Sequence, residues 1–213
     1  MYMSQFQNKA GKPILLEMVQ AIQANKAYLG EIDGLIGDGD HGMNMNKGFT
    51  VFYDRFPGAD IGFTDGLFEL GNILLSEIGG SMGPIYGTIF MEMSDVAGDA
   101  EAVTLALFSN MLSSALSALY EIVDARVGDK TLVDTLAPAC GALEANLGGS
   151  FAGALDAMVS AAEAGKDSTV DLVAKYGRSS RLSERSRGVL DAGATSCFLL
   201  LEAMAKGIKG VLV

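Results

Sequence analysis

Residues 105–127 read LALFSNMLSSALSALYEIVDARV, a long stretch whose apolar residues recur at the three- and four-residue intervals of one face of an α-helix. Gly128 follows it directly, at the position where glycine commonly ends a helix. The rest of the chain has the same helical spacing, and no run of alternating β-branched residues lies between tight turns. This pattern predicts an all-α protein.

Seven further helices are predicted on the two sides of that segment. Pro13 suits the first turn of the first helix, whereas Pro138 lies inside the sixth and should kink it. Because the connections between consecutive helices are short, the chain should form an antiparallel up-and-down barrel or bundle of eight helices. The predicted helices cover residues 13–29, the segment between 41 and 57, and residues 64–78, 84–98, 105–127, 132–147, 151–176 and 194–208.

The composition predicts one domain that covers residues 1–213. Hydrophobic residues make up 49% of the chain, which is enough for a packed core and excludes a disordered protein. The balance of 15 Lys and Arg against 26 Asp and Glu gives a net charge of −11. This charge repels a phosphate backbone and argues against binding to nucleic acid.

Cysteine usage and the chain ends indicate a cytoplasmic protein. Cys140 and Cys197 each stand among apolar residues, so both are expected to be reduced core residues. The N-terminal sequence lacks the basic-then-apolar pattern of a signal peptide. Near the C-terminus, the longest apolar run covers only residues 197–201, too short to span a bilayer. We therefore expect no contact with a membrane.

The 27 glycines are unusual in a helical chain, because a glycine inside a helix costs conformational entropy. We expect them in the loops, where backbone can approach a ligand closely. The longer connections are near residues 30–42, 79–83, 128–131 and 177–193. Function should be sought there.

The first of these connections carries the sequence EIDGLIGDGDHGMN at residues 31–44. It places Asp33, Asp38 and Asp40 in a glycine-rich loop beside His41, the single histidine of the chain. Carboxylates this close repel one another unless a cation holds them together, and an all-oxygen set suits a hard divalent ion such as Mg²⁺. The alternative is a solvated acidic loop that caps the second helix. An EF-hand is excluded, because the twelfth residue counted from Asp38 is Phe49.

Two further connections carry glycine-rich turns. Residues 79–84 read GGSMGP, which is typical of a turn that binds phosphate before a helix that opens with proline. The alternative is a plain connection in which Ser81 caps the helix. Residues 128–131 read GDKT but lack the remaining features of a Walker A loop. One interpretation of these residues is a helix C-cap followed by an N-cap. The alternative is that Gly128 lets the backbone approach a ligand closely.

The fourth connection is rich in arginine. Four of the six arginines of the chain, Arg178, Arg181, Arg185 and Arg187, lie within ten residues. This cationic patch favours a phosphate ligand or an acidic partner, and the alternative is a solvated loop with ion pairs to Glu184. In the sequence DAGATS that follows, Asp191 and Gly193 form either a helix N-cap or a hydrogen-bonding site for a sugar or base.

Taken together, the ordered segments IGDGDHGMNMNKGF, GGSMGPIYGT, GDKTLVD and GRSSRLSERSRG with DAGATS resemble the nucleotide-binding L subunit of dihydroxyacetone kinase. The resemblance spans about residues 12–208. It implies an eight-helix antiparallel barrel with the nucleotide site in the loops at one end. The chain departs from the family pattern at Met82, where many members have serine, and at Ala192, where proline is usual.

The resemblance also implies roles for individual residues. A pair of Mg²⁺ ions would bridge the phosphates of ADP or ATP, and the implied metal ligands are Asp33, Asp38 and Asp40. Arg178 would lie over the nucleotide as the implied catalytic residue. The implied nucleotide contacts are His41, Asn44, Ser81, Met82, Gly128, Arg178, Asp191 and Gly193.

The activity implied by the resemblance is phosphoryl transfer to dihydroxyacetone, which a separate K subunit holds. We favour the phosphoenolpyruvate-dependent type, in which a phosphohistidine carrier protein of the phosphotransferase system recharges bound ADP. The alternatives are an ATP-dependent subunit that serves dihydroxyacetone or another small ketose, a non-catalytic nucleotide-binding regulator, and a purely helical interaction module. A homodimer is compatible with each of them.

Overall fold

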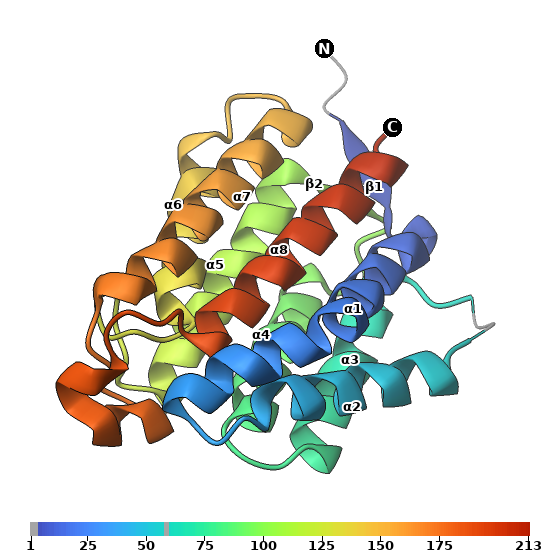
Figure 1. Ribbon diagram of the computed structural model, residues 1–213. Coiled ribbons are helices and arrows are strands. Elements are labelled where there is room, and N and C mark those ends of the chain that lie inside the picture. The colour runs from blue at the N-terminus through green and yellow to red at the C-terminus, as the bar shows by residue number, and fades with distance from the viewer. Residues whose placement is uncertain (1–3, 58–59) are drawn as a thin grey trace.

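The computed structural model describes residues 4–57 and 60–213, and within these residues it contains eight α-helices (Figure 1). The all-α prediction and the predicted number of α-helices are therefore confirmed. The helices are α1 (Lys12–Ile36), α2 (His41–Arg55), α3 (Phe63–Glu77), α4 (Met82–Ala97), α5 (Leu105–Ile122), α6 (Val133–Ala145), α7 (Phe151–Ser168) and α8 (Ala192–Val211). Three 3₁₀ segments accompany them: η1 (Asn8–Ala10), η2 (Thr169–Asp171) and η3 (Arg178–Ser186).

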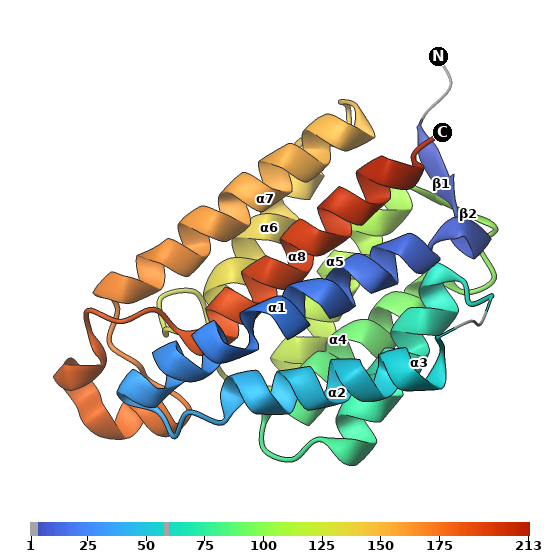
Figure 2. The same cartoon turned by 45° about the vertical axis from the view of Figure 1, so that its right-hand side comes forward.

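The helices form a closed ring. Each α-helix packs against the next one along the chain, and α8 returns to pack against α1. Figures 1 and 2 show this arrangement from two directions, with α1 and α8 side by side in both. The chain is thus an up-and-down helical barrel whose apolar helix faces meet in one core.

Three helix ends differ from the prediction. Helix α1 continues to Ile36, so Asp33 lies on its last turn rather than in a loop. Helix α5 ends at Ile122 rather than at residue 127, because Val123 is extended and leaves the helical path. Helix α7 ends at Ser168 rather than at residue 176, since the chain tightens there into η2. Helix α6 continues through Pro138, as predicted.

A short antiparallel sheet closes one end of the barrel. Strand β1 (Gln5–Gln7) pairs with β2 (Ala102–Thr104), and the C-terminal residue Val213 exchanges backbone hydrogen bonds with Gln5 at 2.9 and 3.2 Å. The prediction that the chain has no strands was wrong here, because three-residue strands are too short to produce a visible alternation. Phe6 points inward and is completely buried.

Several glycines lie inside helices, contrary to the expectation that they occupy loops. Helices α3 and α4 approach each other at Gly71 and Gly87, where a Cβ atom on either residue would lie 3.0 to 3.1 Å from the carbonyl oxygen of the other. At Gly207 on α8, a Cβ atom would lie 2.6 Å from the Cα of Ile14 on α1. These glycines therefore allow close packing between neighbouring helices, which a sequence without its partners does not reveal.

Helix α5 is, within the described residues, the single helix long and apolar enough to cross a membrane, with a mean hydropathy of 1.2. Core helices of soluble proteins pass the same test. The apolar residues on one face of α5, including Phe108, Leu112 and Leu119, are completely buried in the barrel. The hydropathy of α5 is thus explained by its place in the core.

Candidate functional site

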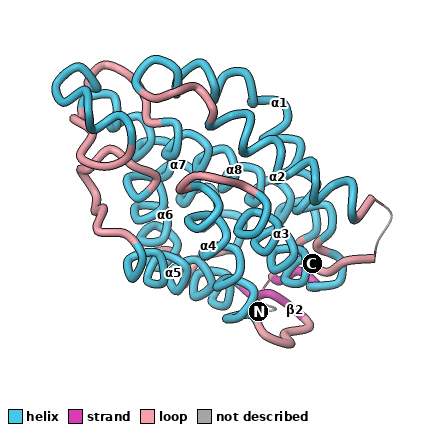
Figure 3. Tube along the Cα trace, turned by 90° about the horizontal axis from the view of Figure 1, so that it is seen from below, coloured by secondary structure: helices cyan, strands magenta, loops and turns pink. Residues whose placement is uncertain are grey.

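The end of the barrel opposite the sheet contains a cavity of about 510 Å³. It is lined by the connections α1–α2, α3–α4, α5–α6 and α7–α8, which Figure 3 shows as loops between the helices. Every metal ligand and nucleotide contact implied by the sequence, except Gly128, lines this cavity: Asp33, Asp38, Asp40, His41, Asn44, Ser81, Met82, Arg178, Asp191 and Gly193. Residues from four distant parts of the chain therefore meet at one site.

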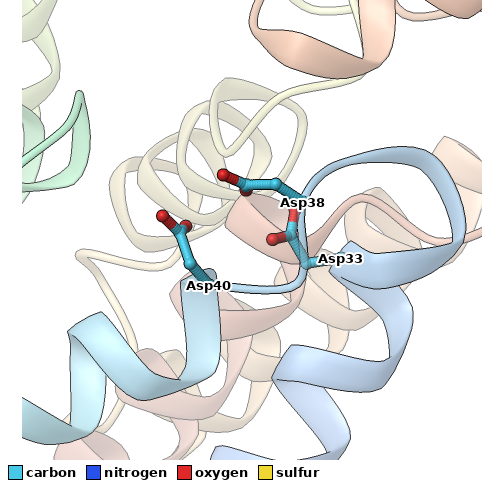
Figure 4. A group of neighbouring side chains, drawn as sticks. All are labelled: Asp33, Asp38 and Asp40. Atoms are coloured by element: carbon cyan, nitrogen blue, oxygen red, sulfur yellow. The ribbon is translucent and has the colours of Figure 1, made fainter.

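Three carboxylates gather at one side of the cavity (Figure 4). Asp33 comes from the last turn of α1, Asp38 from the connection, and Asp40 directly precedes α2. One oxygen from each lies within 4.8 Å of the others. Gly37 is required for this fold of the chain, because a Cβ atom there would collide with Oδ1 of Asp33. Gly39 adopts a φ of 77°, which favours glycine.

This donor set fits a hard divalent cation. It consists of carboxylate oxygens alone, and their mutual repulsion falls when a cation lies among them. The guanidinium of Arg178 provides the nearby positive charge: it pairs with Asp38 and lies 3.4 Å from Oδ2 of Asp40. The arrangement of the carboxylates around one point thus meets the chemical requirement of a magnesium site, and the role of these residues as ligands stays a prediction.

His41 is the first residue of α2 and belongs to a buried chain of side chains. Its backbone amide donates to Oδ2 of Asp33 at 3.3 Å, and its Nε2 lies 2.9 Å from Oγ of Ser196 on α8. The hydroxyl of Tyr86 on α4 lies 2.7 Å from the same Oγ. Burial lowers the pKa of His41 to about 4, although the Asp33 carboxylate acts in the opposite direction. The imidazole is therefore neutral at pH 7.

The turn between α3 and α4 is open toward the cavity. A Cβ atom built on Gly79 or on Gly80 would meet no atom within 4 Å, so there is free space beside the backbone. Ser81 occupies the N-cap position of α4, yet its side chain makes no capping hydrogen bond. The alternative in which Ser81 serves as a helix cap is therefore wrong. Its hydroxyl lies in the wall of the cavity, beside Met82.

Gly128 differs from the other predicted contacts. The structure does not place it in the cavity wall, although Ala125 and Thr131 on its two sides line the cavity. Its amide donates to Oδ1 of Asp134 at 2.5 Å, and its φ of 96° is one that glycine adopts without strain. It is not the C-cap of α5 either, because that helix ends six residues earlier, at Ile122. The turn geometry alone accounts for glycine at this position.

The arginine-rich segment forms the 3₁₀ segment η3 rather than an open loop. Arg178 is the arginine of the segment that lines the cavity. Arg187 instead pairs with Glu184 at 3.2 Å and donates to the carbonyl oxygen of Asp171. The expectation that the whole cluster faces a phosphate ligand is thus met by one residue. The predicted ion pair with Glu184 is present, and Arg187 makes it.

Asp191 caps α8, as one of the two predictions for it stated. Its Oδ2 accepts a hydrogen bond from the amide of Ala194 at 2.7 Å. Burial raises the pKa of Asp191 to about 6, and hydrogen bonding and the charge of Lys130 partly offset this shift. The carbonyl oxygen of Gly193 accepts from the hydroxyls of Tyr86 and Ser196, at 3.3 and 3.1 Å. The start of α8 is therefore held rigidly at the cavity edge.

Tyr86 and Ser196 are functional candidates that the sequence did not single out. Both lie inside segments quoted above, but neither has a spacing that indicates a contact with His41. Ser196 lies 155 residues from His41 in the sequence. Only the closure of the ring brings the two together.

Comparisons with known proteins identify the family of this chain. A family model described as the DAK2 domain matches residues 35–206. The chain is 37% identical to the ADP-binding subunit DhaL of the PEP-dependent dihydroxyacetone kinase from Escherichia coli, over 85% of this chain and 88% of that protein. This chain belongs to the DAK2 domain family of dihydroxyacetone kinase subunits.

A second relative supports the same family, and a solved structure has the same fold. It is 36% identical to the ADP-binding subunit DhaL of PEP-dependent dihydroxyacetone kinase 1 from Listeria innocua, over 87% of this chain and 89% of that protein. The crystal structure of the dihydroxyacetone kinase from C. freundii, in complex with AMP-PNP and Mg²⁺, has the same fold, with a TM-score of 0.67 at 21% identity. The match covers 91% of this chain and 33% of the C. freundii chain.

Proposed function

We propose that this chain is the ADP-binding subunit of a phosphoenolpyruvate-dependent dihydroxyacetone kinase, and that residues 1–213 act as one L-type domain in the cytoplasm. The observation that carries the proposal is the cluster of Asp33, Asp38 and Asp40 facing Arg178 in the cavity. The cavity volume of about 510 Å³ lies in the range of about 300–1,000 Å³ that is common for small-molecule sites. The names of the Escherichia coli and Listeria innocua relatives support the same function.

Asp33, Asp38 and Asp40 would hold a pair of Mg²⁺ ions in this proposal. Bound Mg²⁺ neutralises phosphate oxygens and keeps them in a geometry suited to phosphoryl transfer. The carboxylates of this chain fix the position of the ions because each comes from a rigid place: the end of α1, the glycine turn or the start of α2. A nucleotide with negatively charged phosphates is then attracted to an otherwise negative loop.

The remaining cavity residues bind and orient the nucleotide. Arg178 is the catalytic residue of the proposal: its guanidinium neutralises charge on the transferred phosphoryl group, which needs little covalent help from the protein. His41, held neutral by burial, and Asn44 contact phosphate or ribose without adding charge. Ser81 and Met82 contact phosphate at the α3–α4 turn. Asp191 and Gly193 close the far side of the nucleotide site. Gly128 contributes to the adenine side of that site through the backbone of its turn.

Two partner proteins complete the reaction. A phosphohistidine carrier of the phosphotransferase system transfers its phosphoryl group to bound ADP and forms ATP. The γ-phosphoryl group then passes to a hydroxyl of dihydroxyacetone held on a K subunit, and ADP remains on this chain. The Escherichia coli and Listeria innocua relatives, which are ADP-binding subunits of PEP-dependent kinases, favour this scheme over one in which ATP exchanges with solution.

Purification without added nucleotide tests the proposal. The protein is dialysed extensively against buffer with Mg²⁺, denatured, and its released nucleotide is quantified by chromatography. We expect about one ADP per chain, together with phosphorylation of dihydroxyacetone when a K subunit, a phosphohistidine carrier and phosphoenolpyruvate are supplied. An empty site that turns over ATP with the K subunit contradicts the phosphoenolpyruvate-dependent scheme. Failure to bind any adenine nucleotide contradicts the proposed function as a whole.

A further inference from the structure

Lys130 is a buried cation for which the proposed chemistry has no use. It lies in the α5–α6 connection, and among the described residues it is the one lysine with no exposed surface. Its φ of 61° is unusual, since Ser183 is the one other residue besides glycine with a positive φ in the described chain. A charged side chain with an unfavourable backbone conformation persists only where the surrounding structure requires it.

The ammonium group of Lys130 joins two connections between helices. Its Nζ donates to the carbonyl oxygen of Thr169, directly after α7, and to that of Val189, just before α8. The hydroxyl of Thr169 in turn accepts from the backbone amide of Asp191 at 3.0 Å. A backbone hydrogen bond of 2.7 Å from the amide of Gly188 to the carbonyl oxygen of Val170 ties the two ends of the α7–α8 connection together beside it. One side chain therefore holds the α5–α6 connection against both ends of the α7–α8 connection.

Two carboxylates balance the charge of this buried cation. Asp134, which is 1% exposed, accepts from the amides of Gly128 and Thr131 at 2.5 and 2.7 Å. The carboxylate of Asp191 caps α8. Both carboxylates stabilise the charged form of Lys130, whereas burial lowers its pKa. The two carboxylates therefore act on Lys130 through their charge, while its hydrogen bonds go to the two carbonyl oxygens.

The connections that Lys130 joins are those that carry one side of the cavity. Ala125 and Leu132 line the cavity from the α5–α6 connection, Arg178 from the segment after α7, and Gly193 from the start of α8. Lys130 itself also borders the cavity, although its side chain has no exposed surface. Resting on the proposed function, we propose that Lys130 is a positioning residue that locks these connections in the geometry that binds nucleotide. Two of the three N–H groups of its ammonium are directed to backbone carbonyl oxygens of the α7–α8 connection.

The first test compares two lysine substitutions in the same region. K130M keeps most of the side-chain volume and removes the charge and its hydrogen bonds. K175M is the matched control, because Lys175 also joins two of these connections, through Asp129 at 2.5 Å, but its side chain is 64% exposed. We expect K130M to weaken binding of Mg²⁺–ADP about tenfold, the cost of losing one buried charged hydrogen bond, and K175M to change it by less than about twofold. K130R, which keeps the charge, should restore part of the affinity.

Amide hydrogen exchange gives a readout that needs neither nucleotide nor substitution. If Lys130 locks the connections together, the protected amides of Gly128, Thr131, Gly188 and Asp191 should open as one unit in the wild-type protein, with the same dependence on denaturant. K130M should then lose protection at these amides while those in the centre of α5 remain protected. Because the wild-type protein suffices for the first of these measurements, the role of Lys130 is tested even if K130M does not fold.

The outcomes separate the two proposals. Independent opening of the connections in the wild-type protein, or a K130M variant that binds Mg²⁺–ADP like K175M, overturns the role of Lys130 and leaves the nucleotide site intact. A wild-type protein that binds no Mg²⁺–ADP overturns the proposed function, and hydrogen exchange still tests whether Lys130 joins the connections. Equal losses of affinity in K130M and K175M also overturn the proposal, because they would reflect a general loosening of the surface.

Discussion

The two ends of the barrel are built from different interactions. At the sheet end, β1 and β2 satisfy each other's backbone groups, and Phe6 packs edge-on against Phe63 with ring centroids 5.4 Å apart. No titratable side chain lies in either strand. At the cavity end, three carboxylates crowd together and Lys130 is buried with its charge. The sheet end is thus held by apolar packing and backbone pairing, whereas the cavity end keeps like charges together and a cation buried, at an electrostatic cost.

The largest effect on stability is expected from a substitution at the sheet end. Phe6→Ala removes a completely buried ring that also contacts Phe151, with centroids 6.4 Å apart. We expect the free energy of unfolding to fall by about 4 kcal/mol, the usual cost of deleting a core phenylalanine. Urea unfolding monitored by circular dichroism measures this change. Affinity for Mg²⁺–ADP should stay within about twofold of wild type at low urea, and a parallel loss of affinity would show that the two ends are not independent.

The pH dependence of stability should come from the cavity end. Burial lowers the pKa of His41 to about 4 in the folded, metal-free protein, against an ordinary value of 6.5. As the pH falls from 6.5 to 4, the unfolded chain takes up the proton first, so His41 costs the folded state up to about 3 kcal/mol. The raised pKa of Asp191 acts oppositely, because its protonation near pH 6 favours the folded state.

The contribution of His41 can be separated from that of Asp191. Since His41 is the single histidine of the chain, its imidazole resonances in an NMR titration need no assignment by mutation. A His41→Gln variant should lose less stability between pH 6.5 and 4 than the wild type does, by about 3 kcal/mol. A titration midpoint near the ordinary value would show that the imidazole is solvated and that the cavity end is less closed than described.

Removal of one carboxylate tests whether the crowding at the cavity end serves a ligand. Asp38→Asn should weaken Mg²⁺-dependent binding of ADP about a hundredfold, because even partners outside the first coordination sphere of a metal cost tenfold to a hundredfold. Stability should not fall, since the substitution relieves repulsion with Asp33 and Asp40. Isothermal calorimetry and thermal unfolding measure the two effects. Asp54→Asn, at the exposed end of α2, is the control for a simple loss of negative charge.

The contrast between the ends also explains what the sequence could predict. The eight α-helices follow from local periodicity, which Leu105–Ile122 shows clearly, and the site loops follow from glycine, aspartate and arginine patterns that are local in sequence. The helix ends depend on hydrogen bonds in the connections, which periodicity does not reveal. After α5, for example, the amide of Arg126 donates to Asp129 at 2.8 Å instead of continuing the helix. The short strands and the glycines at helix crossings also depend on partners that only the closed ring supplies.

The site residues likewise divide into those that a local sequence pattern predicts and those that depend on residues far away in the sequence. Asp33, Asp38 and Asp40 were recognisable because three carboxylates in eight residues need a common explanation. Lys130 and Ser196 gave no such signal, because each acts on groups that lie far away in the sequence. Lys130, for example, reaches Val189 across 59 residues. Sequence patterns therefore identify the groups proposed to contact the ligand more readily than those proposed to hold them in place.

Among the residues that depend on distant partners, Ser196 gives the smallest expected effect. Its hydroxyl is completely buried between Nε2 of His41 and the hydroxyl of Tyr86. Ser196→Ala leaves both groups without this partner, and Tyr86 retains a hydrogen bond of 3.3 Å to the carbonyl oxygen of Gly193. We expect a loss of about tenfold in affinity for Mg²⁺–ADP, the equivalent of about 1.4 kcal/mol for one buried hydrogen bond.

The control for this change is Ser160→Ala, which removes an exposed hydroxyl on α7, away from the cavity. The chemical shifts of the His41 ring nitrogens should move in Ser196→Ala and stay unchanged in Ser160→Ala, because only the first alters the partner of Nε2. An unchanged ring spectrum together with reduced affinity would mean that Ser196 acts through the packing of α8 and not through His41. Unchanged affinity would instead mean that the orientation of His41 is fixed by Asp33 and the start of α2 alone.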